Sequence, residues 1–272
     1  MSHTVVTAAR CPLLREPARE SEQLDELLFG WPAEILERPR PGWYLVRSDY
    51  GYEGFAPAAA LCADPERAAA FTALPARTVT RGFCTVLAAP RVQSCPIAEL
   101  TRGALVAPLA QADENGWLKT ALPGGQTGYT KRSFLSSDHK EFPENEADFR
   151  RGVAETALSY LGTHYRWGGK SPLGIDCSGL AFMAYRLNGV TICRDAHLDP
   201  GFPVRPISRP EMKQGDLLYF SGHMAVYLGD GIYIHATARG GSDGVVLNSL
   251  DPAAPCYRAD LAQTLTTIGS IF

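Results

Sequence analysis

Residues 175–180 of the chain read Ile-Asp-Cys-Ser-Gly-Leu, which places a cysteine where a helix is expected to begin. Apolar residues follow at helical spacing, and Asn-Gly at 188–189 is a typical helix stop. A thiol at a helix start lies near the positive end of the helix dipole and near unpaired backbone N–H groups, which favour the thiolate. Cys177 is therefore a candidate nucleophile, and the alternative is a buried structural cysteine.

A nucleophilic cysteine needs a base, and two histidines lie in a predicted β-hairpin. Gly-Asp-Gly at 229–231 is a strong turn signal between two β-like runs. His223 and His235 each lie six residues from Gly229, so symmetric pairing places them opposite or nearly opposite each other, and directly opposite side chains are about 5 Å apart at Cβ. Together with Cys177, the two histidines supply the nucleophile, the base and the orienting group of a catalytic triad. The alternative is a zinc site formed by Cys177, His223 and His235.

Length and composition limit the possible classes of protein. The 272 residues suit two or three domains, and 45% hydrophobic with 20% charged residues is typical of a globular protein. A net charge of -3 gives no attraction to nucleic acid or anionic membranes, so neither partner is expected. The seven cysteines are irregularly spaced without a C-x-x-C pair, which favours reduced thiols, no metal and no other cofactor.

The first half of the chain contains an internal repeat with an offset of 74 residues. The matched pairs are Gly42/Gly116, Trp43/Trp117, Gly54/Gly128, Phe55/Tyr129 and Leu61/Leu135. Glycines, aromatics and leucines that coincide at one shift indicate a duplication. Short alternating runs broken by turn residues predict a small all-β barrel in each copy, at residues 1–65 and 75–138.

The second half predicts an α+β domain over residues 145–272, after a polar linker at 136–146. A helix is expected over 148–161, followed by the helix that begins near Cys177. The predicted strands cover 216–220, 223–228, 232–237 and 244–247. Helices followed by an antiparallel sheet are typical of the α+β class.

Two resemblances follow from these motifs. Each repeat unit resembles a bacterial SH3-like (SH3b) domain, through G-W-x-x-V followed by G-x-x-G-aromatic; the alternative is a pair of spacer barrels without a ligand site. The second half resembles the NlpC/P60 family of cysteine peptidases, whose fold is papain-like. The residues that carry it are Tyr165-Arg-Trp-Gly-Gly169, Asp176-Cys-Ser-Gly-Leu180, Gly215-Asp-Leu217, Gly222-His-Met-Ala-Val-Tyr-Leu-Gly229 and Ile234-His-Ala236.

The family resemblance implies a role for each motif residue. Cys177 is the implied nucleophile, His223 the general base and later acid, and His235 the orienting group. Tyr165 is expected beside the thiolate, and the Cys177 backbone N–H is expected to stabilise the oxyanion. Ser178 is implied to hold a glutamate carboxylate.

The order of two SH3b barrels and one NlpC/P60 domain resembles a subgroup that cuts freed cell-wall peptides. Its implied reaction is hydrolysis of the bond from γ-D-glutamate to L-Lys or diaminopimelate in a peptide with a free N-terminal L-Ala. A buried ammonium needs an acidic partner. The Arg194-Asp195 segment is implied to bind substrate, with Asp195 as the partner of the amine. The first barrel is implied to contribute the gating aromatic Tyr52 and an acidic residue, Glu22 or Glu26. Residues 196–201 depart from the subgroup's pattern.

The expected location is the cytoplasm, in the recycling of wall peptides, because residues 1–10 lack the pattern of a secretory signal. Three alternatives stay open. In the first alternative the chain is an exported endopeptidase acting on intact peptidoglycan. In the second it is a non-catalytic wall-binding protein, and in the third an acyltransferase on the same fold. The sequence makes no prediction of the oligomeric state.

Overall fold

The computed structural model describes residues 2–136 and 145–272, and each of these two ranges lies in its own compact unit. Most of the predicted linker, residues 137–144, lies outside the described residues. Among the described residues, no helix is both long and apolar enough to cross a membrane.

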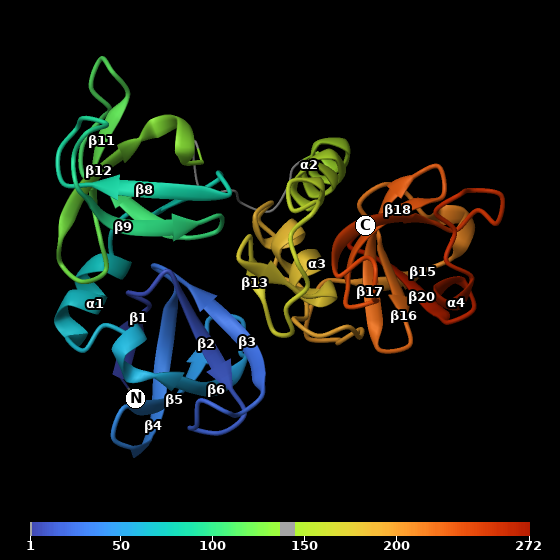
Figure 1. The fold of residues 1–272 in the computed structure, drawn as a ribbon, viewed down its shortest axis with the longest axis horizontal. Helices are drawn as coiled ribbons and strands as arrows, with labels where there is room; N and C mark the ends of the chain where they lie inside the picture. Colours follow the sequence, from blue (N-terminus) through green and yellow to red (C-terminus); the bar gives the residue numbers. More distant parts are fainter. Residues whose placement is uncertain (1, 137–144) are drawn as a thin grey trace. The chain divides into compact units, whose positions relative to one another are not determined.

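The N-terminal unit is rich in β-structure and contains two six-stranded sheets within residues 2–136 (Figure 1). The first sheet has the strand order β1-β4-β5-β6-β2-β3 and the second β7-β10-β11-β12-β8-β9. The strands of the first are β1 (Ser2–Val5), β2 (Arg10–Leu14), β3 (Gln23–Leu28), β4 (Pro32–Arg40), β5 (Trp43–Ser48) and β6 (Glu53–Pro57). The strands of the second are β7 (Arg77–Thr78), β8 (Phe83–Leu87), β9 (Pro96–Thr101), β10 (Leu105–Pro108), β11 (Trp117–Ala121) and β12 (Thr127–Lys131).

The shared strand order is what the sequence repeat predicts. Trp43 and Trp117 begin β5 and β11, and the 3₁₀ turns Ala58–Ala60 and Arg132–Phe134 keep the offset of 74 residues. The glycines of β6 and β12 make room for the neighbouring strand. A Cβ atom at Gly54 would lie 2.8 Å from Leu13 Cβ, and one at Gly128 would lie 2.5 Å from a Val86 methyl group.

The two sheets of this unit also contact each other directly. The Trp31 indole N–H donates to the Gly103 carbonyl oxygen at 2.8 Å, and the Leu105 N–H donates to the Phe29 carbonyl oxygen at 2.8 Å. Helix α1 (Pro65–Thr72), which the sequence did not predict, follows the first sheet and is capped by the Asp64 side chain.

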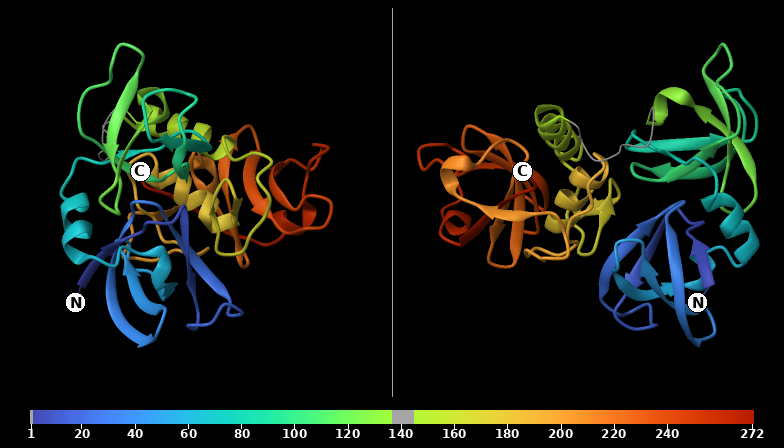
Figure 2. Two further views of the ribbon diagram at one scale, coloured as in Figure 1. Left: turned by 60° about the vertical axis from the view of Figure 1, so that its left-hand side comes forward. Right: turned by 180° about the vertical axis from the view of Figure 1, so that it is seen from behind.

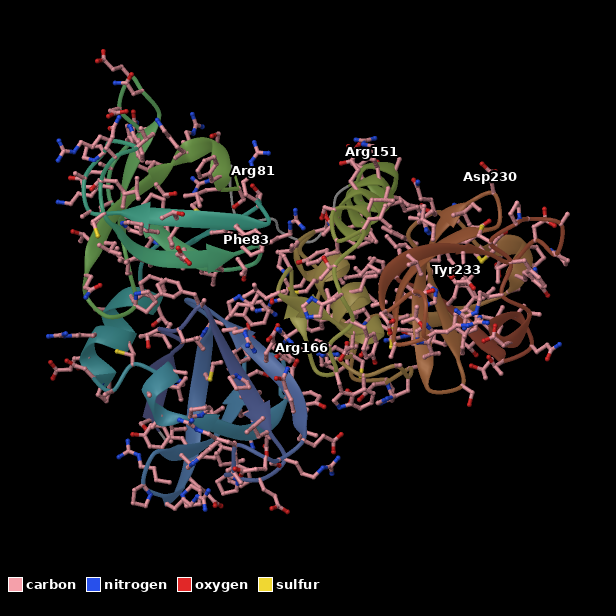
Figure 3. All side chains as sticks on the ribbon, in the orientation of Figure 1. Arg81, Phe83, Arg151, Arg166, Asp230 and Tyr233 are labelled. Atoms are coloured by element: carbon pink, nitrogen blue, oxygen red, sulfur yellow. The ribbon has the colours of Figure 1, made fainter. Side chains whose placement is uncertain are left out.

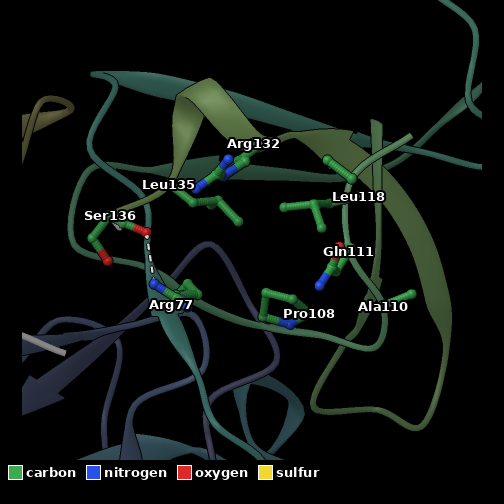
Figure 4. A pocket seen from close by; sticks show the side chains of 9 residues that line it. Arg77, Pro108, Ala110, Gln111, Leu118, Arg132, Leu135 and Ser136 are labelled. Atoms are coloured by element: carbon green, nitrogen blue, oxygen red, sulfur yellow. Dashed lines mark hydrogen bonds between the residues drawn. The ribbon is translucent and has the colours of Figure 1, made fainter. Parts of the chain in front are cut away.

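The second sheet of this unit borders a cavity of about 400 Å³ (Figure 4). Leu118 and Leu135 line it together with Arg77 and Arg132, and Arg77 donates a hydrogen bond to the Ser136 carbonyl oxygen. None of the predicted site residues lines this cavity.

The C-terminal unit combines helices with an antiparallel sheet, which confirms the predicted α+β class. Its sheet order is β15-β20-β16-β17-β18-β19, and helices α2 and α3 pack together and against β17 (Figures 1 and 2). The helices are α2 (Glu146–Leu158), α3 (Cys177–Arg186) and α4 (Ala259–Ala262), with a 3₁₀ turn at Arg209–Glu211. The strands are β13 (Lys170–Ser171), β14 (Gly174–Ile175), β15 (Arg205–Ile207), β16 (Leu217–Phe220), β17 (His223–Gly229), β18 (Ile232–Thr237), β19 (Gly244–Ser249) and β20 (Leu265–Ser270).

This sheet is covered on both faces. One cluster contains Leu218, Phe220 and Tyr233, with Leu261 of α4 packed against it. The residues that alternate with these along the strands are also fully buried: Leu217, Met224, Val226 and Ile234. The sequence did not predict β15, at the sheet edge, or β20 beside it. β15 is three residues long and contains Pro206, a residue that edge strands tolerate.

Candidate active site

Helix α3 begins at Cys177 because Asp176 caps it. The Asp176 carboxylate accepts hydrogen bonds from the backbone N–H of Gly179 at 2.6 Å and of Gly168 at 2.7 Å, and so ties the helix start to the preceding loop. Gly179 lets that loop approach closely, since a Cβ atom there would lie 2.1 Å from the Gly169 carbonyl oxygen. The glycines and Asp176 of the motif therefore fix the position of the cysteine.

The Cys177 thiol lies beside the strand that carries His223. The backbone N–H of Met224, in the peptide bond that joins it to His223, donates a hydrogen bond to Sγ, as does the N–H of Ser178. The thiol is 8% exposed. The catalytic helix and β17 thus meet at the sulfur atom.

The pKa of this thiol differs from the value expected at a helix start. Burial is the largest influence and, with the nearby Asp176 carboxylate, raises the pKa of Cys177 to about 11, although the two N–H donors and Arg194 act in the opposite direction. The helix start alone predicts a lowered pKa, which is wrong here because the sulfur is removed from water. The resting nucleophile is a neutral thiol that needs a base.

The two histidines are joined in a hydrogen-bonded chain. His223 Nε2 lies 2.6 Å from His235 Nδ1, and His235 Nε2 lies 2.8 Å from Asn248 Oδ1. The Asn248 amide is oriented by its own N–H, which donates to the Cys256 carbonyl oxygen at 2.8 Å. Asn248 Oδ1 is then an acceptor, so His235 carries its proton on Nε2 and accepts through Nδ1 from His223. His223 is left with an unprotonated Nδ1, the form a base requires.

The pairing of the hairpin shows how the two histidines face each other. Val226 pairs with Ile234, and the register shifts between Tyr227 and Gly229 at the turn. His223 and His235 are therefore diagonal neighbours on one face rather than directly opposite. The predicted turn is present, with Asp230 at its tip in a left-handed conformation (Figure 3).

Both imidazoles are held in the neutral form. Burial, followed by the neighbouring His235, lowers the pKa of His223 to about 3. Burial also lowers the pKa of His235 to about 4, against the hydrogen bond to Asn248, which raises it. His235 is fully buried, and both of its ring nitrogens are engaged by neighbours, so the alternative zinc site at these side chains does not fit the geometry.

Tyr165 lies close enough to the Cys177 thiol for that group to affect the pKa of the Tyr165 phenol. Burial, and then the charge of the Cys177 thiolate, raise the pKa of the Tyr165 phenol. Its backbone forms a bridge to Ile175, two residues before the nucleophile. A neutral phenol at this place is a hydrogen-bond donor for an anion formed at the sulfur or at a bound carbonyl.

Arg194 and Ser178, both predicted to bind substrate, contact Asp176 in the structure. Arg194 is 2% exposed and bonds to both carboxylate oxygens, at 3.1 and 3.0 Å. It also donates to the Ser178 hydroxyl at 2.7 Å, and that hydroxyl lies 3.3 Å from Asp176 Oδ1. These three side chains support the start of α3. Their substrate-binding roles stay predictions.

The other predicted substrate residues lie in different surroundings. Asp195 is exposed, in the segment between α3 and β15. In the N-terminal unit, Glu22 pairs with Arg15 at 2.7 Å, Glu26 is fully buried, and the Tyr52 ring lies 6.5 Å from the Tyr50 ring. Their roles toward substrate also stay predictions.

Asn248 is a functional residue that the sequence analysis missed. The predicted strand ended at residue 247, whereas β19 extends to Ser249 and so includes Asn248. The structure pairs His235 with Val246, and Asn248 lies two positions further along β19 on the same face. Side chains alternate between the two faces of a strand, so a strand extended two residues beyond Val246 would have placed Asn248 on the face of His235.

Together these groups define a class of protein. A buried thiol at a helix start, with a neutral imidazole base and an orienting imidazole on the adjoining sheet, is the site of a papain-like cysteine peptidase. The fold and the site chemistry both support this class.

Comparisons with known proteins agree. The model of the NlpC/P60 family matches residues 162–255. The chain is 41% identical to Dipeptidyl-peptidase 6 of Lysinibacillus sphaericus over 99% of this chain and 100% of that protein. It is 32% identical to the gamma-D-glutamyl-L-lysine dipeptidyl-peptidase of Bacillus subtilis (strain 168), over 48% of this chain and 45% of that protein. A crystal structure of an NlpC/P60 family protein from Bacillus cereus ATCC 10987 has a TM-score of 0.81 and 20% identity, with 98% of each chain covered.

The chain belongs to the NlpC/P60 family of cysteine peptidases. The resemblance predicted from its motifs is thereby confirmed.

Proposed function

We propose that this peptidase hydrolyses the γ-D-glutamyl bond to L-Lys or meso-diaminopimelate in cell-wall peptides with a free N-terminal L-Ala, and so releases L-Ala-γ-D-Glu. The full-length similarity to a dipeptidyl-peptidase, 41% over 272 residues, is the observation that carries the proposal. The name of the Bacillus subtilis relative supports the γ-D-glutamyl bond as the one cut.

The site chemistry suits this hydrolysis. His223 Nδ1 removes the thiol proton while Sγ of Cys177 attacks the γ-carbonyl carbon, and the protonated His223 then gives its proton to the leaving amine. The oxyanion is stabilised by the Cys177 backbone N–H and the Tyr165 phenol. Water, activated by His223, then hydrolyses the thioester and frees the dipeptide.

The preference for a free amine is assigned to Asp195. Its exposed carboxylate lies one residue beyond Arg194, whose side chain is bonded to the cap of the catalytic helix. An ammonium ion that leaves water needs such a partner. Tyr52, with Glu22 or Glu26, is proposed to close the site from the first barrel.

The proposed role is recycling of wall peptides in the cytoplasm. All seven cysteines are free thiols, which suits a reducing compartment. A substrate with a free L-Ala amine is produced only after the peptide has been cut from the glycan, so the enzyme acts downstream of an amidase-type reaction.

The test compares L-Ala-γ-D-Glu-L-Lys with the same tripeptide N-acetylated on L-Ala. The free tripeptide should be cleaved, and acetylation should lower kcat/KM by at least about 10-fold, since a hydrogen bond between charged groups contributes about 1.5–3 kcal/mol and about 1.4 kcal/mol is a factor of ten. Equal rates would contradict the amine recognition. Clearing of intact cell-wall suspensions would favour the exported endopeptidase instead.

A further inference from the structure

A cluster of metal-ligating side chains lies outside the catalytic triad, in the segment between α3 and β15. Cys193, His197 and Asp199 each offer one ligand atom, and these three atoms all lie within 4.8 Å of one another. Their spacing is C-x₃-H-x-D, and His197 and Asp199 lie within residues 196–201, which depart from the subgroup's sequence pattern. A thiolate, an imidazole and a carboxylate form a donor set suited to zinc.

The distances fit one bound ion. Zinc bonds of about 2.3 Å to sulfur and 2.0 Å to nitrogen, at a tetrahedral angle, separate the two ligand atoms by about 3.5 Å. Cys193 Sγ and His197 Nε2 are 3.8 Å apart. A small side-chain adjustment therefore brings both atoms to bonding distance of a shared ion.

The surroundings orient two of the ligands. Asp199 Oδ1 accepts a hydrogen bond from the Gly201 N–H at 2.7 Å, which leaves the second carboxylate oxygen for a metal. The Asp195 backbone N–H donates to Cys193 Sγ and so orients the thiol. Cys193 and Asp199 are half-buried and His197 is exposed, so an ion can enter from solvent.

We propose that Cys193, His197 and Asp199 bind one Zn²⁺ ion, with a fourth position open to water. Three protein ligands and one open position form a common zinc arrangement. The site is separate from the triad. Cys193 lies before Asp195 in the chain, and His197 and Asp199 lie after it. A bound ion therefore links the two ends of the loop that carries Asp195. The binding proposal stands independently of the proposed substrate.

The experiment uses the full chain with Cys177→Ala, which removes the catalytic thiol as a competing ligand. Zn²⁺ is titrated into this protein by calorimetry, and Co²⁺ is titrated in parallel to detect a thiolate-to-cobalt charge-transfer band. We expect one equivalent of Zn²⁺ and a cobalt band. Adding Cys193→Ser or His197→Ala should abolish the bound equivalent, and Cys193→Ser should also abolish the band.

Cys95→Ser in the same background is the matched control, because Cys95 is an exposed thiol in the other unit and its loss should change nothing. His197 is exposed, so its replacement by alanine keeps the test valid even if Cys193→Ser fails to fold. Absence of a bound equivalent, or binding that survives both Cys193→Ser and His197→Ala, would overturn the proposal.

Discussion

His223 Nε2 lies 2.6 Å from His235 Nδ1, and this contact connects the base to a part-buried chain of hydrogen bonds that ends at the Cys256 carbonyl oxygen. Each donor in the chain has one acceptor, so the Asn248 amide at its end determines where the imidazole protons lie. The base is therefore prepared by groups that are linked to it through hydrogen bonds.

The first prediction concerns the acid limb of the pH profile. A base must be neutral, and a lowered pKa keeps it neutral at lower pH. With the pKa of His223 at about 3, kcat/KM should stay high well below pH 6.5, the ordinary histidine value. Steady-state rates from pH 4 to pH 9 measure this limb.

A half-maximal rate near pH 6.5 would show that His223 is not held neutral. Buried neutral histidines also make folding less stable as the pH falls from 6.5 toward 4, since the unfolded chain binds the protons. Near-UV circular dichroism at each pH is the control for unfolding.

The second prediction concerns Asn248. Asn248→Ala removes the acceptor that fixes the His235 tautomer, so kcat should fall by at least about 10-fold, within the 10²–10⁴ that a positioned base supplies. The acid limb should move, because the substitution changes the hydrogen bonds of the imidazole pair, and KM should change little.

Cys256→Ala is the matched control for this variant. It keeps the backbone carbonyl that accepts from Asn248 and should retain nearly full activity. If Asn248→Ala retained full kcat and an unchanged pH profile, Asn248 would have no positioning role.

The third prediction concerns Arg194. Arg194→Ala leaves the Asp176 carboxylate buried without its cationic partner, and losing one member of a buried pair costs about 3–5 kcal/mol of unfolding free energy. Urea unfolding measures this loss. Arg151→Ala, which breaks an exposed pair with Asp148, is the control and should have little effect. Equal effects of the two variants would mean that Arg194 does not stabilise the helix start.

Much of the architecture was predictable because local rules determined it. Gly42 and Gly116 both adopt left-handed backbone conformations before their tryptophans, so the repeat in sequence corresponds to a repeated turn. Asp176 is a good helix cap, which placed Cys177 correctly at the first position of α3.

Properties that depend on tertiary packing were not predictable. The bulge between Tyr227 and Gly229 shifts the register of the histidine hairpin, and no local signal specifies it. The raised pKa of Cys177 results from burial under elements distant in sequence. Arg194 was predicted to bind substrate, and its contact with the Asp176 carboxylate became visible only in the folded chain.

The most direct test of the account is identification by mass spectrometry of the products formed from L-Ala-γ-D-Glu-L-Lys. The wild-type enzyme should release L-Ala-γ-D-Glu and free L-Lys in equal amounts, and Cys177→Ala, checked for folding by circular dichroism, should release neither. Cleavage at another bond, or dipeptide release by the Cys177→Ala enzyme, would contradict it.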